Sequence, residues 1–411
     1  MAAQSRQGLP PRRTVCRVNT LIPRDEQDAA SIVADAAARR MPLNLCGNGT
    51  KAAMGRPNQI EASLTSAALT GITLYEPAEM VISARSGTPL AEVVETLAEK
   101  GQQLPFEPMD YRLLLGSRGE PTIGAVAAMN LSGPRRIMEG AARDSLIGVR
   151  FVNGRGEVIK SGGRVMKNVT GLDLVKLMAG SWGTLGFLTE VTFKVLPKPE
   201  RMSTLLIRGL DDESAVAALS AALGSPFDVT AAAHLPAPDR QGARTLIRLE
   251  GFSVSVDYRL GELRRLLKRF GGADILEGRG AEAVWQALRD ASIFQDRGER
   301  AVWRISTAPT KGPTLVARVA ETIEAQWFYD WGGGLVWLAT PAEGDLGAAA
   351  IRAATSALGG HATLVRAPDA DRSRLDVFEP QAEAVMALSR GIKASLDPAG
   401  ILNPGRMYAG I

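Results

Sequence analysis

The chain has 411 residues, of which 45% are apolar and 22% are charged, a balance typical of globular proteins. This length predicts two or three packing units and a core large enough to fold without disulfides. No stretch reaches the roughly 18 uninterrupted apolar residues of a membrane-spanning helix, so direct membrane insertion is not expected. The net charge of +4 is small and no run of Lys or Arg exceeds a pair, so nucleic acid is not expected as a partner.

Histidine and cysteine are both scarce. The chain contains only His234 and His361, and only Cys16 and Cys46. Two thiols cannot hold a four-cysteine iron–sulfur cluster or a structural zinc ion, and two imidazoles provide poorly for a metal site. We therefore predict no metal site and two free thiols in a reducing cytoplasm. If the protein is a redox enzyme, something other than these residues must carry the electrons.

The N-terminal half alternates helix and strand. Residues 1–20 are expected to form a mobile tail, because the first 16 lack the apolar core of a secretory signal. A helix over residues 25–41 then leads into a strand over Leu43–Cys46. A second strand over Met80–Ala84 leads into a helix for which Thr88 is the predicted N-cap. This alternation is typical of α/β layers.

A hairpin and a domain boundary follow. Strand patterns over residues 145–152 and 157–160 flank Asn153-Gly154-Arg155-Gly156, a sequence that favours a tight turn. A further alternating run, Leu188–Leu196, ends at a pair of prolines. This pair marks the predicted domain boundary after residue 198.

Beyond the prolines, over residues 199–378, the pattern becomes strand, helix, strand, strand, helix, strand. It spans residues 204–276 and recurs over 301–366, and each copy looks like a ferredoxin-like βαββαβ unit. The segment Trp327–Trp337 is predicted to be a hairpin packed on helices, with a surface for a substrate or partner as the alternative. Residues 379–411 are predicted to form a helix and a compact tail.

The segment Gly47-Asn48-Gly49-Thr50-Lys51 follows a predicted strand. It offers successive backbone N–H groups, a hydroxyl and an ammonium group, which together can surround phosphate oxygens. It has neither the spacing of a Walker A loop nor that of a dinucleotide-binding fingerprint. A tight turn and an anion-binding loop therefore both remain open from this motif alone.

Two later segments are rich in small residues. Pro121–Asn130 would let a flat ligand approach the backbone closely, although a well-packed helix is the alternative. Gly180, Gly183 and Gly186 precede an alternating strand, which indicates backbone folded against a ligand. Three glycine-rich sites joined by α/β units predict one extended cofactor that crosses two subdomains.

These motifs together resemble the FAD-binding domain shared by relatives of vanillyl-alcohol oxidase and p-cresol methylhydroxylase (PCMH). Within that superfamily, the match is similar to the FAD-binding subunits of bacterial glycolate oxidase, also called glycolate dehydrogenase. The segments that carry the resemblance are Pro121–Gly124, Leu131–Arg136, Arg143–Gly148, Val165–Leu174, Gly180–Leu188 and Asn403–Tyr408. They are dense in the N-terminal 200 residues, sparse in the following domain and well represented in the tail.

The resemblance implies an α+β fold in four parts. After the N-terminal tail, residues 21–198 would form a two-subdomain PCMH-type FAD-binding domain. Residues 199–378 would form a cap domain of ferredoxin-like βαββαβ units. Residues 379–411 would return to pack on the FAD-binding domain.

The resemblance also implies FAD as the cofactor, with Gly47, Asn48, Gly49, Thr50 and Lys51 on its pyrophosphate. The residues expected around the adenine-ribose and the flavin are Thr122, Ile123, Gly124, Asn130, Ser132, Gly133, Arg143, Asp144, Gly183, Thr184, Gly186, Phe187 and Leu188. In many relatives a histidine at the Thr50 position tethers the flavin covalently. Because threonine stands here, we expect the FAD to be noncovalent.

The activity implied by the resemblance is oxidation of glycolate to glyoxylate, with hydride passing to flavin and electrons to partner subunits. Those partners are a larger FAD-containing glycolate oxidase subunit and an iron–sulfur subunit. Relatives often place histidines and an acidic residue around a metal in the cap, and this chain lacks such a histidine cluster. We therefore assign no catalytic residue, and the larger subunit is the better candidate for oxidising the small hydroxy acid.

Two alternatives stay open at this point. The chain could be a self-sufficient FAD-dependent dehydrogenase of another 2-hydroxy acid, or a structural, non-catalytic subunit with a vestigial flavin site. In each case we expect a cytoplasmic protein, with contact to the inner membrane only through partners.

Overall fold

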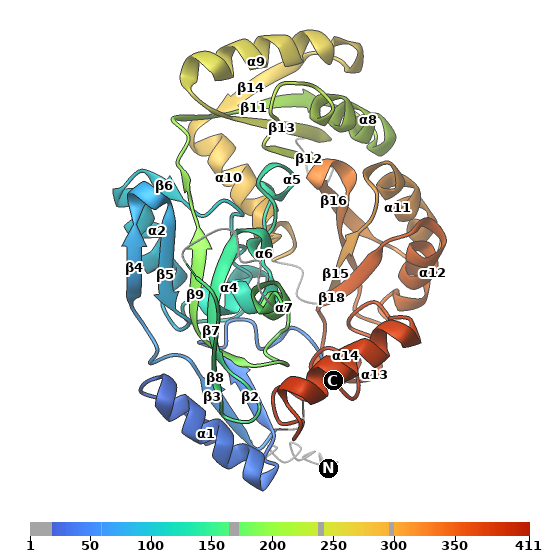
Figure 1. Cartoon of the computed structure of the whole chain (residues 1–411). Helices are drawn as coiled ribbons and strands as arrows, with labels where there is room; N and C mark the ends of the chain where they lie inside the picture. Colours follow the sequence, from blue (N-terminus) through green and yellow to red (C-terminus); the bar gives the residue numbers. More distant parts are fainter. Residues whose placement is uncertain (1–18, 59, 164–171, 237–241, 296–299) are drawn as a thin grey trace, which may run out of the picture.

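The computed structural model describes residues 19–58, 60–163, 172–236, 242–295 and 300–411. Most of the predicted N-terminal tail and most of the motif Val165–Leu174 lie outside these ranges. Figure 1 shows an N-terminal part that contains the smaller sheets, a large sheet above it that we call the cap sheet, and a C-terminal helix that returns to the N-terminal part. No helix within the described ranges is both long and apolar enough to cross a lipid bilayer.

The N-terminal part begins with a small parallel sheet in the order β1-β3-β2. Its strands are β1 (Asn19–Leu21), β2 (Leu43–Cys46) and β3 (Ala62–Thr65). Helix α1 (Glu26–Arg39) joins the first two strands, and the Asp25 side chain caps its first turn. The helix buries alanine and valine at helical spacing, as its sequence pattern predicts.

The second sheet of this part has five strands in the order β4-β5-β9-β7-β8. They are β4 (Ile72–Glu76), β5 (Val81–Arg85), β7 (Leu146–Val152), β8 (Val158–Gly162) and β9 (Phe187–Lys194). The predicted hairpin is confirmed, because Val152 pairs with Val158 across the turn. Asn153 Oδ1 holds that turn by accepting from the backbone N–H groups of Arg155 and Glu157, at 2.9 and 3.0 Å.

Short elements lie between and after the strands of this sheet, and two of them, β6 and β10, pair with each other in a two-stranded sheet. They are η1 (Pro77–Glu79), α2 (Leu90–Glu99), β6 (Gln102–Gln103), α3 (Arg112–Leu115), α4 (Ile123–Met129), α5 (Arg136–Glu139), α6 (Ala142–Ser145), α7 (Leu174–Met178) and β10 (Leu196–Pro197). The prediction that Thr88 is an N-cap is wrong, because α2 starts one residue later and Pro89 takes that position. The Thr88 hydroxyl instead donates to Arg85 O at 2.7 Å.

The cap sheet has eight strands in the order β14-β11-β13-β12-β16-β17-β15-β18. The first half of the sheet comes from β11 (Arg201–Arg208), α8 (Asp212–Leu223), β12 (Ala231–Leu235), β13 (Arg244–Gly251), α9 (Ser253–Leu266) and β14 (Ala273–Glu277). The second half comes from β15 (Arg300–Ser306), α11 (Gly312–Ala320), β16 (Gln326–Asp330), β17 (Leu335–Pro341), α12 (Ala348–Leu358) and β18 (His361–Arg366). This order of elements agrees with the two predicted βαββαβ units.

The two units join edge to edge into one sheet, which the sequence pattern did not predict. The second strand of each unit lies at the junction, where His234 of β12 pairs with Tyr329 of β16. At this junction, the edge strand of each unit is therefore paired with a strand of the other unit. Helix α10 (Gly278–Arg289) connects the units and was also not predicted.

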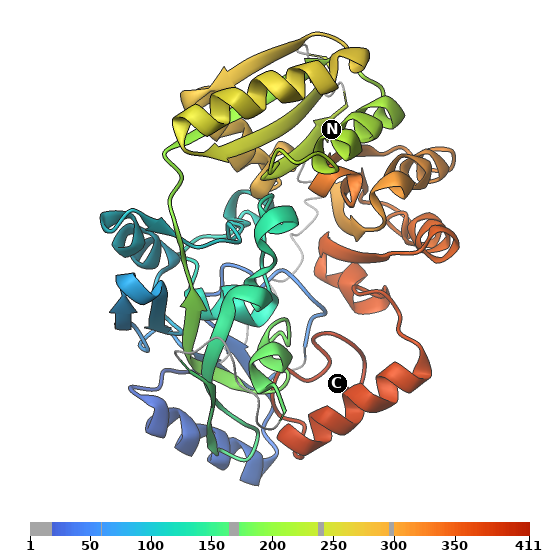
Figure 2. The same ribbon diagram turned by 45° about the horizontal axis from the view of Figure 1, so that its top comes forward.

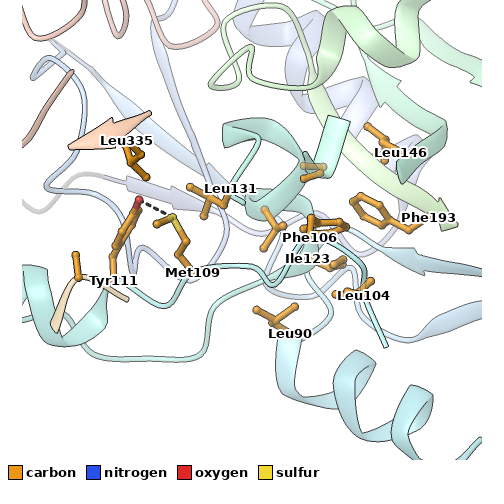
Figure 3. Packing of buried hydrophobic residues seen from close by; sticks show 14 of the residues in the cluster. Leu90, Leu104, Phe106, Met109, Tyr111, Ile123, Leu131, Leu146, Phe193 and Leu335 are labelled. Atoms are coloured by element: carbon orange, nitrogen blue, oxygen red, sulfur yellow. Dashed lines mark hydrogen bonds between the residues drawn. The ribbon is translucent and has the colours of Figure 1, made fainter. Parts of the chain in front are cut away.

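The two faces of the cap sheet have different neighbours. The four long helices α8, α9, α11 and α12 cover the outer face, as Figure 2 shows. The other face packs against the N-terminal part, and Phe328 and Trp337 share one apolar core with Phe106 and Phe193. Tyr111, from the loop before α3, meets Trp337 edge to face with ring centroids 6.0 Å apart. Figure 3 shows this core from Leu90 and Phe193 to Leu335.

Buried ion pairs also join the cap sheet to the N-terminal part. Arg248 of β13 donates to both carboxylate oxygens of Glu107, at 3.0 and 2.8 Å. Arg135 donates its backbone N–H to the same Glu107 and lies 3.2 Å from Glu250. Two arginines and two glutamates thus neutralise one another in a largely buried position.

The end of the chain returns to the first sheet. Leu43 donates its N–H to Ile401 O at 2.8 Å, and Asn403 donates to Leu43 O at 3.0 Å. Before this, α13 (Asp369–Arg374) and α14 (Glu383–Leu396) leave the cap sheet. The buried Lys393 ammonium lies 2.7 Å from Asp397 and donates to backbone carbonyls at the same distance, which fixes the end of α14.

Replacing Glu107 by glutamine should lower the free energy of unfolding by about 3 kcal/mol, because Arg248 would lose the carboxylate that binds it through two oxygens. Burial by itself raises the pKa of Glu107, but Arg248 and Arg135 outweigh it and leave the pKa below its ordinary value. The stabilisation is therefore present above the unfolded-state pKa of about 4.5 and is lost as the pH falls below it.

Urea denaturation at pH 7 and pH 4 would measure this difference, with the exposed Glu79→Gln as the matched control. A variant as stable as the wild type at pH 7 would contradict the prediction.

Candidate functional site

A partly open cavity of about 820 Å³ lies where the loop after β2, the helix α4 and the start of β9 meet. The residues that line it are Asn44, Leu45, Cys46, Gly47, Asn48, Gly49, Thr50, Lys51, Ala52, Ser66, Ser86, Thr122, Gly124, Ala125, Ala128, Met129, Trp182, Gly183, Gly186, Phe187, Leu188, Asn403 and Arg406. The glycine-rich segments of the sequence thus surround one space.

Most of the site residues predicted from the sequence line this cavity. They are Gly47, Asn48, Gly49, Thr50, Lys51, Thr122, Gly124, Gly183, Gly186, Phe187 and Leu188. The predicted residues absent from its lining are Ile123, Asn130, Ser132, Gly133, Arg143, Asp144 and Thr184. A role for this second group in ligand binding stays a prediction.

The second group holds the loops beside the cavity. Asn130 ends α4 in the left-handed region, and its Oδ1 accepts from Arg143 N at 2.8 Å. Ser132 Oγ accepts from Ala142 N at 2.9 Å, and Asp144 accepts from Ala141 N at 2.7 Å. These bonds fix the segment that follows α4.

The remaining members of that group are also engaged in the fold. Ile123 is buried in the core shared with the cap sheet. The Thr184 hydroxyl donates to Ser181 O at 2.7 Å, and Gly133 O accepts from the Trp331 indole at 3.1 Å. Each of these three residues therefore contacts other residues of the chain.

Gly47 and Thr122 pack closely against each other in one wall of the cavity. A Cβ on Gly47 would lie 2.4 Å from Thr122 Oγ1, so no larger residue fits without a shift. Thr122 Oγ1 is buried and has no hydrogen-bond partner among the described residues. Gly124 packs equally closely against Ser86, since a Cβ at position 124 would lie 2.6 Å from Ser86 O. A ligand that offers polar atoms would satisfy the Thr122 hydroxyl.

Lys51 places a largely buried ammonium group at the same cavity. The side chain is only 7% exposed, and its one hydrogen bond in the described structure is to Thr50 Oγ1 at 3.4 Å. Burial lowers the pKa of Lys51 to about 8, although Asp110 partly opposes this shift. A buried amine without a close carboxylate is suited to bind an anion such as a phosphate.

The C-terminal tail completes the cavity with residues that the sequence analysis had not assigned to the site. Asn403 Oδ1 accepts from Leu45 N at 2.7 Å, and its Nδ2 donates to Trp182 O at 2.7 Å. Arg406 donates to Ala52 O at 3.2 Å, and burial lowers its pKa to about 10. The Asn403–Tyr408 motif was visible in the sequence, but only the fold places it beside β2.

Neither histidine lies at the cavity. His234 is fully buried in β12, where its Nδ1 lies 3.0 Å from Thr245 Oγ1 and its Nε2 lies 3.4 Å from Asp212. His361 begins β18 at the far edge of the cap sheet. No group of three or more His, Cys, Asp or Glu side chains that could hold a metal ion occurs in the part of the chain that the structure describes.

Comparison with known proteins identifies the family. Residues 19–162 match the FAD binding domain, and residues 378–407 match the C-terminal domain of FAD linked oxidases. The chain is 35% identical over 377 residues to the glycolate oxidase subunit GlcE of Escherichia coli (strain K12), which covers 92% of this chain and 95% of that protein. The chain belongs to this family of FAD-linked oxidoreductases. The family and the FAD-binding domain expected from the motifs are thus confirmed.

Further proteins that are similar to this chain are consistent with this assignment. The glycolate oxidase subunit GlcD of Bacillus subtilis (strain 168) is 28% identical over 53% of this chain and 43% of its own length. Among solved structures, 4-ethylphenol oxidase from Gulosibacter chungangensis has a TM-score of 0.70 at 15% identity, covering 95% of this chain and 89% of that one. Alkyldihydroxyacetonephosphate synthase has a TM-score of 0.68 at 16% identity, covering 94% and 75%. These two structures establish the fold alone.

The cavity residues fit FAD. Its diphosphate carries negative charge, which suits the Lys51 ammonium and the backbone N–H groups of Gly47–Thr50. The unpartnered Thr122 hydroxyl and the small residues of α4 suit a flat, polar ligand held close to the backbone.

Substituting Lys51 by methionine should weaken FAD binding about tenfold at pH 7, the usual effect of losing a hydrogen bond to a charged group. Wild-type affinity should fall as the pH rises above about 8, because the bound diphosphate favours the charged amine that deprotonates there. The Lys51→Met variant should lack this pH dependence.

Flavin fluorescence titrations between pH 7 and pH 9.5 would measure both effects, with the exposed Lys100→Met as control. The same decline of affinity with pH in Lys51→Met would contradict the assignment.

Proposed function

We propose that this chain is the FAD-binding subunit of a complex that oxidises glycolate to glyoxylate. The observation that carries the proposal is the extent of the similarity to the glycolate oxidase subunit GlcE, which spans 95% of that protein. The flavoprotein cavity described above supports it, because its lining provides for a diphosphate and for a flat ring system.

FAD, when bound, supplies the two-electron acceptor for removal of hydride from a substrate carbon. The chain's own residues bind and orient this group. Lys51 and the N–H groups of Gly47–Thr50 would hold the diphosphate. The tail residue Asn403 bonds to Leu45 and Trp182, which also line the cavity. Ala128, Met129 and Trp182 of the cavity lining pack against the apolar core shared by the cap sheet and the N-terminal part.

Electrons would leave through partner subunits, a larger FAD-containing subunit and an iron–sulfur subunit. The names of GlcE and GlcD describe both as subunits of glycolate oxidase, which favours a complex. The sequence has two cysteines, too few for the ligands of a four-cysteine cluster. Such a complex would be cytoplasmic and would meet the inner membrane only through those partners.

The flavin should be held without a covalent bond, because Thr50 lines the cavity at the position where a tethering histidine is found in many relatives. Acid precipitation of the FAD-loaded protein should therefore give a colourless pellet and release flavin into the supernatant. Yellow colour retained in the denatured pellet would contradict this prediction. The absorbance of both fractions near the flavin band is the measurement.

Anaerobic addition of glycolate tests whether this chain or another subunit of the complex oxidises glycolate. The purified chain should show a flavin spectrum that glycolate does not bleach, whereas the assembled complex should be reduced. Bleaching of the isolated chain would instead favour a self-sufficient dehydrogenase. A colourless chain in the purified complex would favour a structural subunit with a vestigial flavin site.

A further inference from the structure

Helix α14 lies on the surface, and little of its length packs on the rest of the chain. Of its residues, Glu383–Leu396, only Lys393 is buried. Met386, Ser389 and Leu396 are half-buried on the same side of the helix, and the other residues are exposed. Figure 2 shows α14 at the outside of the molecule. Because an isolated helix of this length is marginal in water, contacts at its ends must hold it.

The segment before α14 is anchored to the cap sheet and to the flavin cavity. The Glu379 carboxylate accepts from the Arg352 guanidinium and from Ala362 N, the latter at 2.9 Å. Phe378 meets Trp182 edge to face with ring centroids 5.0 Å apart, and Trp182 lines the flavin cavity. The start of α14 is therefore fixed beside the cavity.

The end of α14 is anchored to another part of the same cavity. Lys393 Nζ donates to Thr184 O and to Leu402 O at 2.7 Å each, and Asp397 neutralises its charge. Gly183, the neighbour of Thr184 in sequence, lines the cavity. The helix is thus held at both ends and presented to the outside next to the flavin site.

Three large apolar side chains run along the exposed length of this helix, and we call them the α14 stripe. Val385, Leu388 and Ile392 are 46%, 70% and 36% exposed. Their spacing of i, i+3 and i+7 places them on one side of the helix. The other exposed residues on that side are small: Ala384, Gly391 and Ser395. No charged residue of α14 interrupts the stripe.

The charged side chains of α14 lie on its other sides and are paired. Arg390 forms an ion pair with Glu383, and Lys393 forms one with Asp397. The helix therefore offers no unpaired cation to an anionic lipid surface or to nucleic acid. A surface helix usually has polar residues on its solvent side, and a contiguous exposed apolar patch marks an interaction site. The chemistry of the stripe fits an apolar groove on another protein.

A second group of exposed apolar residues, on α9, has a different position and different neighbours. Val254 and Tyr258 are exposed there, and the exposed basic residues Arg264 and Arg265 follow on the same helix. Figure 1 shows α9 at the opposite end of the molecule from α14 and from β2, whose loop lines the cavity. A partner that exchanges electrons with a flavin in the cavity would therefore dock at α14 rather than at α9.

We propose that the α14 stripe is the docking surface for the iron–sulfur subunit of the complex, which binds it in an apolar groove. The spacing of Val385, Leu388 and Ile392 is that of helices that dock in such grooves. The identity of the partner rests on the proposed function. Two electrons of the reduced flavin would pass to the clusters of this subunit, and the flavin protons to water. A second copy of this chain would bring no such acceptor, because its two cysteines are too few for a four-cysteine cluster.

Co-purification tests the proposal. The tagged full-length chain is co-expressed with the larger flavin subunit and the iron–sulfur subunit, and the retained subunits are quantified. Leu388→Asp should reduce the retained iron–sulfur subunit at least about tenfold, because it places a charge in an apolar contact. Leu388→Met should retain this subunit. The matched control Val254→Asp, which changes an exposed apolar residue of α9, should assemble as the wild type does.

Photo-crosslinking identifies the occupant directly. A benzophenone side chain in place of Leu388 should crosslink the iron–sulfur subunit in the purified complex, whereas the same group in place of Val254 should not. The thermal midpoint of the isolated Leu388→Asp chain should equal that of the wild type, because the side chain at this position is mostly exposed. If Leu388→Asp lowers the midpoint, the crosslink decides the question without that variant.

Four results would overturn the proposal. They are a Leu388→Asp chain that folds and retains the iron–sulfur subunit as the wild type does, an equal loss in Val254→Asp, a crosslink from position 388 to the larger flavin subunit or to a second copy of the chain, and no crosslink from that position.

The same experiments separate this proposal from the proposed function. A complex that needs Leu388 for assembly but does not oxidise glycolate would count against the proposed function alone. A complex that oxidises glycolate and assembles equally well with Leu388→Asp would count against the docking surface alone.

Discussion

The architecture depends on the buried contact between Glu107 and Arg248, which fixes the cap sheet on the N-terminal part. Both oxygens of Glu107 bind one guanidinium, and the same carboxylate accepts from the backbone of Arg135. A buried ion pair of this kind is costly to leave half-made, so it tolerates only one relative position of the two parts. The aromatic core around Tyr111 and Trp337 then packs in that position.

A second constraint closes the molecule from the other end. The tail residue Asn403 bonds to Leu45 and Trp182, and Lys393 is buried against Asp397 beside it. Residues separated by most of the sequence therefore meet at the wall of the flavin cavity. Backbone and amide groups make these contacts, which position the loops closely. Thr122 and Lys51 also line the cavity, and the Thr122 hydroxyl has no hydrogen-bond partner among the described residues.

The buried cations of the flavoprotein fall into two groups, according to whether a carboxylate of the protein lies beside them. Arg135 and Arg248 are neutralised within the protein and contribute to the fold. Lys51 lies at the cavity, and its one hydrogen bond within the described residues is to Thr50 Oγ1. A largely buried ammonium group such as that of Lys51 reduces stability, and at this cavity it is suited to binding an anion.

The sequence by itself determined the local elements, the glycine-rich motifs and the family, because strand and helix periods, turn residues and close backbone approach are local properties. It also grouped Gly47–Lys51 and Thr122 in one predicted ligand site, and the structure places these residues around one cavity. Only the tertiary structure decided that β12 and β16 join two units into one sheet and that Asn403 and Arg406 complete the cavity. Both features depend on partners distant in sequence, which leave no periodic signal along the chain.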